Sequence, residues 1–117
     1  MYIIYDHCPI FFYIERYVVH AFGFGVTTVV CWQGLCALLV ISKSARPSFG
    51  MLVLCVSAGM GFGALNEVIE FAATLLVPET NVGGYFNTGW DMVANLFGTT
   101  GAAVLIWLGA KPNGEVG

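Results

Sequence analysis

Residues 49–77 read FGMLVLCVSAGMGFGALNEVIEFAATLLV, and this stretch decides the fold. Its formally charged side chains are Glu67 and Glu70. An α-helix rises about 1.5 Å per residue, so a helix of this length exceeds the roughly 30 Å hydrocarbon core of a bilayer. We therefore predict that the stretch crosses a membrane as one tilted helix.

Two further apolar runs flank this one in the chain. The first covers residues 17–42 and carries no formal charge unless His20 is protonated. The second covers residues 89–110 and has Asp91 and Asn95 in its first two turns. Each run is long enough to span a bilayer, so we predict an all-α integral membrane bundle of about three transmembrane helices.

The segments outside these runs divide the chain. A basic turn over residues 43–48 and a polar loop over residues 78–88 separate the three spans. The aromatic N-terminal stretch is broken by charged residues and proline into pieces too short to span. We expect an interfacial or re-entrant segment at residues 1–16, a transmembrane domain at residues 17–110 and a flexible tail at residues 111–117.

The overall composition agrees with a membrane protein and excludes other classes. Of the 117 residues, 58% are hydrophobic and 9% are charged, whereas about a quarter of the residues in a soluble domain are charged. A net charge of −3 with four Lys and Arg residues argues against nucleic-acid binding. The expected partners are membrane lipid and either a second copy of the chain or a larger membrane complex.

Basic residues predict the orientation in the membrane. Lys43, Arg46 and Lys111 fall on one side of the three-span arrangement, and Arg16 falls on the other. Cytoplasmic loops carry an excess of Lys and Arg. We therefore predict a multi-pass protein of the cell membrane with its N-terminus outside and its C-terminus in the cytoplasm.

Polar residues in the three predicted spans fall at a similar depth, in the outer leaflet. An ionisable group at the bilayer centre costs about 2.5–3.5 kcal/mol on insertion scales, so such groups normally face the bundle interior and one another. We predict a shared polar site with at least two of its ionisable groups within hydrogen-bonding reach. Its residues are His20, Glu67, Glu70, Asp91 and Asn95.

Small residues predict where the helices approach each other closely, because association in lipid depends on packing rather than on burial from water. The predicted packing residues are Gly23, Thr27, Gly59, Gly63, Gly98 and Ala102. Three cysteines inside the spans are also interpreted as small packing residues: Cys31, Cys36 and Cys55.

The polar positions also resemble a known family. HAFGFG at residues 20–25, NEVIE at residues 66–70 and NTGWDMVANLFG at residues 87–98 resemble the VanZ-like membrane proteins and the related YjdF-like inner-membrane proteins. Arg16 stands where those families have an acidic residue. The resemblance implies that the same five polar residues form the site. The association of VanZ-like proteins with glycopeptide-antibiotic resistance implies an envelope or lipid-linked setting.

The residues of the site allow three chemistries: a metal site, a proton or cation relay, and general acid–base hydrolysis of a lipid-linked substrate. We assign no metal, because the set has a single His and no tight ligand motif. The sequence leaves open whether the chain binds a cofactor. Structural roles are also open. Thr88 and Asp91 suit the capping of a helix N-terminus, and Asn95 suits a hydrogen bond between helices.

Two classes of function therefore remain. In the first, the chain is of VanZ-like type and its polar site handles a lipid headgroup, a proton or an ion. In the second, it is a non-catalytic accessory subunit that assembles with a larger membrane protein complex through its buried polar and small-residue faces. Whether the chain catalyses a reaction is left open by the sequence.

Overall fold

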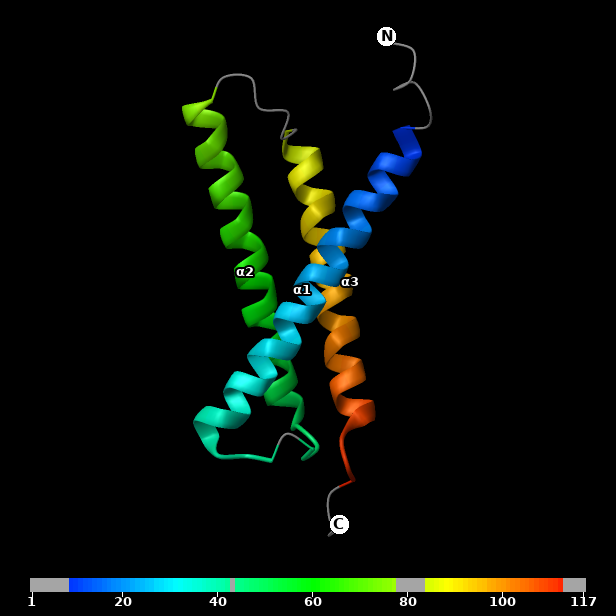
Figure 1. Ribbon diagram of the computed structural model, residues 1–117, viewed down its shortest axis with the longest axis vertical. Coiled ribbons are helices and arrows are strands. Elements are labelled where there is room, and N and C mark those ends of the chain that lie inside the picture. Colours follow the sequence, from blue (N-terminus) through cyan, green and yellow to red (C-terminus); the bar gives the residue numbers. More distant parts are fainter. Residues whose placement is uncertain (1–8, 43, 78–83, 113–117) are drawn as a thin grey trace.

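The computed structural model describes residues 9–42, 44–77 and 84–112 of the chain. Its helices are α1 (Pro9–Leu39), α2 (Phe49–Leu76) and α3 (Tyr85–Gly109) (Figure 1). Each helix is long and apolar enough to cross a membrane. The predicted all-α membrane bundle with three spans is confirmed.

The start of α1 differs from the prediction. The helix begins at Pro9 rather than at residue 17, because proline at the first helical position lacks only an N–H that has no intrahelical partner there. Residues 9–16 therefore form the first turns of a continuous helix, whose candidate span begins at Tyr13. Residues 1–8 lie outside the described part, and the membrane depth of the predicted interfacial segment stays a prediction.

The end of α1 has a defined backbone geometry. Val40 follows the last helical residue in the left-handed region, with φ of 53°. The N–H of Ile41 donates to the carbonyl oxygen of Cys36 at 2.9 Å. This is the pattern of a Schellman cap, and it stops the helix before the predicted end at residue 42.

The other two helices begin and end close to the predicted positions. Ser48 caps the start of α2, where its hydroxyl oxygen accepts from the N–H of Met51 at 3.3 Å. The end of α2 at Leu76 falls one residue before the predicted end, residue 77. The third helix begins at Tyr85, four residues before residue 89. Residues 78–83 of the connecting loop, like the tail from residue 113, lie outside the described part.

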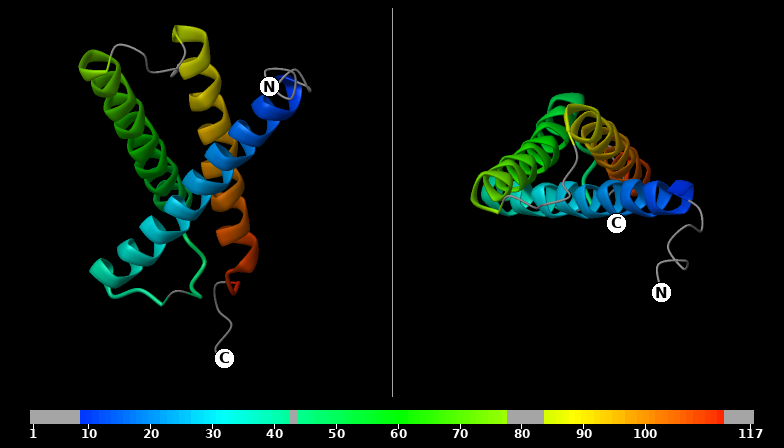
Figure 2. Two further views of the ribbon diagram at one scale, coloured as in Figure 1. Left: turned by 45° about the horizontal axis from the view of Figure 1, so that its top comes forward. Right: turned by 90° about the horizontal axis from the view of Figure 1, so that it is seen from above.

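The three helices are arranged as a triangle when the molecule is viewed along its long axis (Figure 2). In Figure 1, α1 crosses the bundle obliquely, with α3 alongside its middle. The contact between α1 and α3 is the most extensive of the three helix pairs. Because α1 is tilted, different faces of it meet α3 and α2 along its length.

Glycines lie where the helices approach most closely. A Cβ at Gly98 of α3 would meet the backbone carbonyl of Ala21 in α1. A Cβ at Gly63 of α2 would lie 2.6 Å from Nδ2 of Asn95, and one at Gly59 would meet the fully buried Thr28. Ala102 of α3, which we also predicted at a contact, is buried.

The predicted packing face of α1 needs a correction. A Cβ at Gly23 would meet nothing within 4 Å, and the Thr27 hydroxyl donates to a carbonyl of its own helix. Gly25 and Thr28 make the close contacts instead. The contact line of a tilted helix follows the i,i+4 ridge and so moves round the helix, whereas the predicted stripe ran straight along it.

An apolar cluster closes the end of the bundle opposite to the start of α3. Trp32 and Cys36 of α1 pack there against Cys55 of α2. The loop before α2 is tied to the end of α3, because the N–H of Lys111 donates to the carbonyl oxygen of Ser44 at 2.9 Å. We call this end the basic end, since Arg46 and Lys111 lie there, and the opposite end the polar end.

Candidate functional site

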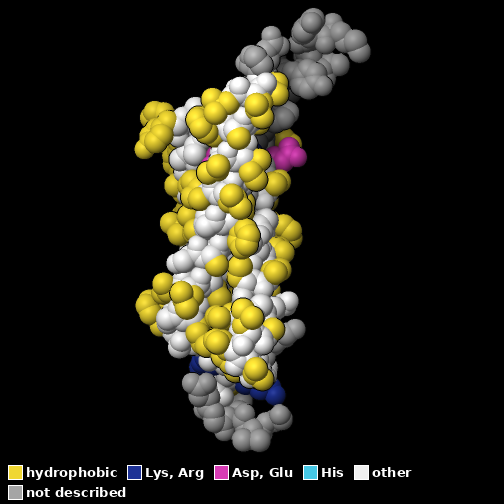
Figure 3. Space-filling model, turned by 90° about the vertical axis from the view of Figure 1, so that its left-hand side faces the viewer, with side chains coloured by type: hydrophobic (Ala, Val, Ile, Leu, Met, Phe, Trp, Pro, Cys, Tyr) yellow, Lys and Arg dark blue, Asp and Glu magenta, His cyan; other side chains and the backbone are white. Residues whose placement is uncertain are grey.

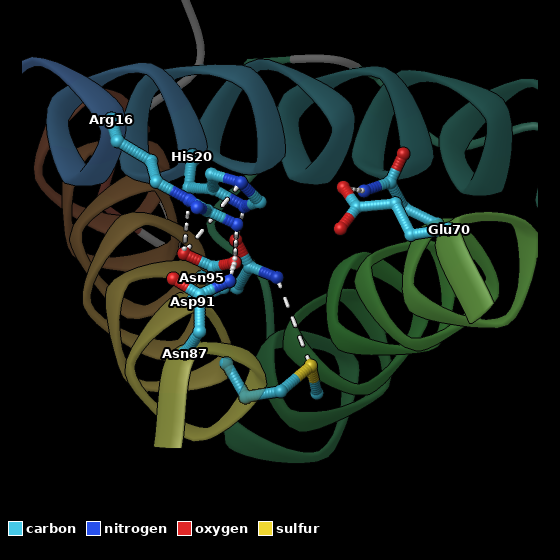
Figure 4. A network of polar contacts seen from close by, with 8 residues as sticks. Arg16, His20, Glu70, Asn87, Asp91 and Asn95 are labelled. Carbon is cyan, nitrogen blue, oxygen red and sulfur yellow. Dashed lines mark hydrogen bonds and ion pairs between the residues drawn. The ribbon is translucent and has the colours of Figure 1, made fainter. Parts of the chain in front are cut away.

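An ion pair joins α1 to α3 at the polar end. The guanidinium of Arg16 donates through Nε to Oδ1 of Asp91 at 3.1 Å and through Nη2 to Oδ2 at 2.6 Å (Figure 4). Asp91 is fully buried, whereas the Arg16 side chain is 31% exposed. A carboxylate held by two parallel N–H groups is fixed in orientation as well as partly neutralised. Asn87 adds a further contact, from Nδ2 to Oδ2 of Asp91 at 3.4 Å.

His20 lies one turn further along α1 and contacts two residues of α3. Its Nδ1 is 3.1 Å from Oδ1 of Asn95, and its Nε2 is 3.8 Å from Oδ1 of Asp91. An amide oxygen only accepts, so Nδ1 is the donor in this contact. The hydrogen bond to Asn95 therefore holds the ring with Nε2 turned toward the carboxylate of Asp91.

The contribution of α2 to the site is Glu67. One ligand atom from each of His20, Glu67 and Asp91 lies within 4.8 Å of the other two. Oε1 of Glu67 is buried and has no hydrogen-bond partner among the described residues. Thr88 of α3 lines the same cavity as this carboxylate. All three helices thus deliver an ionisable or polar group to one place.

Glu70, which is predicted as a member of the shared site, lies at its border and contacts a residue of its own helix. Its Oε1 accepts from Nδ2 of Asn66, one turn earlier on α2, at 3.0 Å. Figure 4 shows Glu70 on α2, well to one side of the Arg16 and Asp91 group. Glu67, Glu70 and Thr88 line a common cavity of about 210 Å³. Glu70 therefore borders the site through this cavity.

Three residues of this network were not among the predicted site residues: Arg16, Asn66 and Asn87. Arg16 precedes His20 by four residues, so the two share a helix face. That spacing is visible in the sequence, but the prediction places Arg16 in the N-terminal segment of residues 1–16 and therefore outside the first span. Asn87 and Asn66 each lie four residues before an acid of the predicted set, and each donates to it.

The charges of the site are unbalanced. Arg16 offsets the charge of Asp91, which leaves the carboxylates of Glu67 and Glu70 facing the cavity. With Nδ1 of His20 donating to Asn95, a neutral ring presents a lone pair at Nε2 to the Asp91 carboxylate. Two acceptors that face each other in a low-dielectric site repel, so a bound cation or an added proton stabilises this arrangement.

The residues can also hold a metal ion. Two ligand atoms of one ion lie at most twice the metal–ligand distance apart, which is about 4.8 Å for a bond of about 2.4 Å, as in Ca²⁺ sites, and about 4.2 Å for a bond of about 2.1 Å, as in Zn²⁺ sites. The set of His20, Glu67 and Asp91 meets the wider limit, so an ion with shorter bonds would draw the three side chains closer together. One imidazole with two carboxylates suits a divalent ion of intermediate hardness. In metal sites the ring nitrogen of histidine that does not bind the ion usually donates a hydrogen bond, which orients the ring, and Nδ1 of His20 makes such a bond to Asn95.

Fold and site together define a small multi-pass membrane protein with polar side chains buried between its helices. Residues 1–111 match the family described as Predicted membrane protein (DUF2238), and the chain belongs to this family. Neither the curated proteins nor the solved structures contain a match to it. The predicted relationship to a family of small membrane proteins is confirmed at this level, and so is the multi-pass membrane location.

Proposed function

We propose that this protein binds a divalent cation between its three helices, with His20, Glu67 and Asp91 as ligands. The observation that carries the proposal is the meeting of these three side chains, one from each helix, with ligand atoms within 4.8 Å of one another. The buried Oε1 of Glu67, which has no hydrogen-bond partner in residues 9–42, 44–77 and 84–112, supports it. Burying such an oxygen is unfavourable unless an ion or a proton interacts with it.

A cation fits the site better than an anionic lipid headgroup. Among the described residues at the polar end, the only Lys or Arg is Arg16, whereas the acids are Glu15, Glu67, Glu70 and Asp91. Both Asp91 oxygens already accept from Arg16. An anion would therefore meet a cation whose charge is already offset by Asp91, and it would be repelled by the carboxylates of Glu67 and Glu70 that line the adjacent cavity.

The VanZ-like relationship and the placement in the outer leaflet belong to the same proposal. They rest on the order of the His, Glu and Asp motifs and on the positive-inside rule. In this arrangement the site opens toward the outside of the cell. A proton is then the natural competitor for the site, because histidine and carboxylate ligands bind a metal only in their deprotonated forms.

The test is metal binding by the purified full chain in detergent, measured by calorimetry with Mn²⁺, Zn²⁺ and Ca²⁺ in turn. We expect one Mn²⁺ or Zn²⁺ per chain, and an affinity that falls as the pH is lowered. Glu67→Gln should weaken binding by about tenfold or more. The matched control is Glu15→Gln, because Glu15 is an exposed acid on α1. An affinity that is equal in the parent and in Glu67→Gln contradicts the proposal.

One observation favours the second candidate, an accessory subunit. Gly61 of α2 and Gly101 of α3 are exposed, and a Cβ at either would meet nothing within 4 Å. Glycine in a helix costs about 1 kcal/mol relative to alanine, and it allows close approach of another helix. Under this proposal, Gly61→Leu with Gly101→Leu changes the size of the complex isolated in mild detergent and leaves metal affinity unchanged. Glu67→Gln should instead leave the size of the complex unchanged and lower the metal affinity.

A further inference from the structure

A groove runs between α2 and α3 at the basic end, which is the end of the bundle opposite to the polar site. It has a volume of about 450 Å³ and is lined mainly by apolar side chains, among them Leu52, Val56, Val104 and Trp107. Phe49, the first residue of α2, also lines it, so the groove reaches the N-terminus of that helix. Its lining suits a hydrocarbon chain.

Arg46 stands at the end of this groove. The centre of its guanidinium lies 4.4 Å from the centroid of the Trp107 ring. Trp107 also lines the groove, so this side chain contacts both the groove and the cation. Nε of Arg46 is buried and has no hydrogen-bond partner within the described ranges. The Arg46 residue as a whole is only partly buried, so its charge stays within reach of an anion from the membrane, and a phosphate group is one of the anions that a guanidinium binds through two parallel N–H groups.

The electrostatic environment of Arg46 is positive. Lys111 lies beside the same loop, because residue 111 forms a β-bridge with Ala45 and its N–H donates to Ser44. The N-terminus of α2 adds the positive end of a helix dipole. In the part of the chain that the structure describes, every acid lies in the opposite half of the molecule. Figure 3 shows this separation of charge on one face.

We infer that the basic end binds an anionic phospholipid, with one acyl chain in the groove between α2 and α3 and the phosphate on Arg46. The inference does not depend on the cation site. A phospholipid is favoured over free phosphate because the guanidinium of Arg46 lies against Trp107, which also lines the apolar groove. A helix of another protein is disfavoured, since an apolar helix face would fill the groove and supply no anion for Arg46.

The experiment is native mass spectrometry of the full chain in detergent, titrated with phosphatidylglycerol, phosphatidylcholine or inorganic phosphate. We expect one phosphatidylglycerol to bind more tightly than phosphatidylcholine by about fivefold or more, as expected for about one added cation at a membrane surface. Arg46→Gln should abolish this preference, and Arg46→Lys should keep part of it. Circular dichroism checks that each variant keeps its helical content.

Two further variants test the groove itself. Val56→Trp places a large ring in the groove and should weaken phosphatidylglycerol binding. Leu54→Trp is its matched control, since Leu54 is exposed on α2 and does not line the groove. Equal binding of the two lipids by the parent overturns the inference. So does a preference that survives in Arg46→Gln, or a competition in which inorganic phosphate alone displaces the lipid.

Discussion

At the polar end, Arg16 and Asp91 join α1 to α3 through two hydrogen bonds, whereas at the basic end Trp32 and Cys36 join α1 to Cys55 of α2 by apolar packing. In water the second kind of contact would dominate. In lipid, an apolar side chain gains little by leaving the acyl chains for another helix. The polar contacts therefore fix the register of α1 against α3, and the apolar contacts fill the remaining space.

The largest expected effect is at the ion pair. Arg16→Gln leaves the fully buried Asp91 carboxylate without its cation. Breaking a buried pair costs about 3–5 kcal/mol, and we expect about 3 kcal/mol because Arg16 is 31% exposed. The free energy of unfolding in mixed detergent micelles measures this loss.

A double variant separates pairing from packing at this position. Asp91→Asn together with Arg16→Gln removes both charges, so its cost should be smaller than that of Arg16→Gln alone. The variant Glu15→Gln serves as the control on the same helix. Equal stability of Arg16→Gln and the parent would show that the ion pair does not set the register of α1.

The sequence predicted where the helices begin and end more accurately than it predicted which side of each helix contacts its neighbours. The apolar runs predicted α2 to within one residue at each end, because hydropathy and length alone decide a membrane span. The predicted start of the first span, residue 17, is wrong because the prediction treats Pro9 as a break. Proline also suits the first position of a helix, and α1 begins there. That error placed Arg16 outside the first span and hid its pairing with Asp91.

The site followed from depth and from the cost of buried charge. Those two arguments predicted that His20, Glu67 and Asp91 would meet, and the structure brings their ligand atoms together. They could not predict which neighbour each side chain selects. Glu70 is bound by Asn66 of its own helix. The tilt of α1, which no local pattern encodes, decided that Gly25 rather than Gly23 lies at the contact.

A smaller effect is expected where α1 and α3 touch through glycine. Gly98→Ala adds a Cβ against the backbone carbonyl of Ala21, which cannot rotate away, so the helices must separate. Overpacking of this kind costs about 1–3 kcal/mol. Gly101→Ala is the matched control, because its Cβ would enter open space, and its higher helix propensity should stabilise the chain by up to about 1 kcal/mol. The same unfolding assay compares the two variants. If both raised or both lowered the free energy of unfolding, the assigned contact at Gly98 would be contradicted.

The smallest expected effect is at the basic end, where the backbone rather than a side-chain contact sets the geometry. Val40 adopts a φ of 53° after α1, and its side chain is 93% exposed. A left-handed conformation costs an L-residue roughly 1–2 kcal/mol, and glycine avoids this cost but loses about 0.5–1 kcal/mol through its freer unfolded chain.

Val40→Gly should therefore raise the free energy of unfolding by up to about 1.5 kcal/mol, since the first term exceeds the second by about 0–1.5 kcal/mol. Leu39→Gly is the matched control, since Leu39 is the last residue of α1 and adopts helical angles. Glycine there should lower stability by up to about 1 kcal/mol. A loss of stability in both variants would mean that the turn at residue 40 does not need its left-handed residue. In that case the basic end would depend on the packing of Trp32, Cys36 and Cys55 to hold α1 against α2.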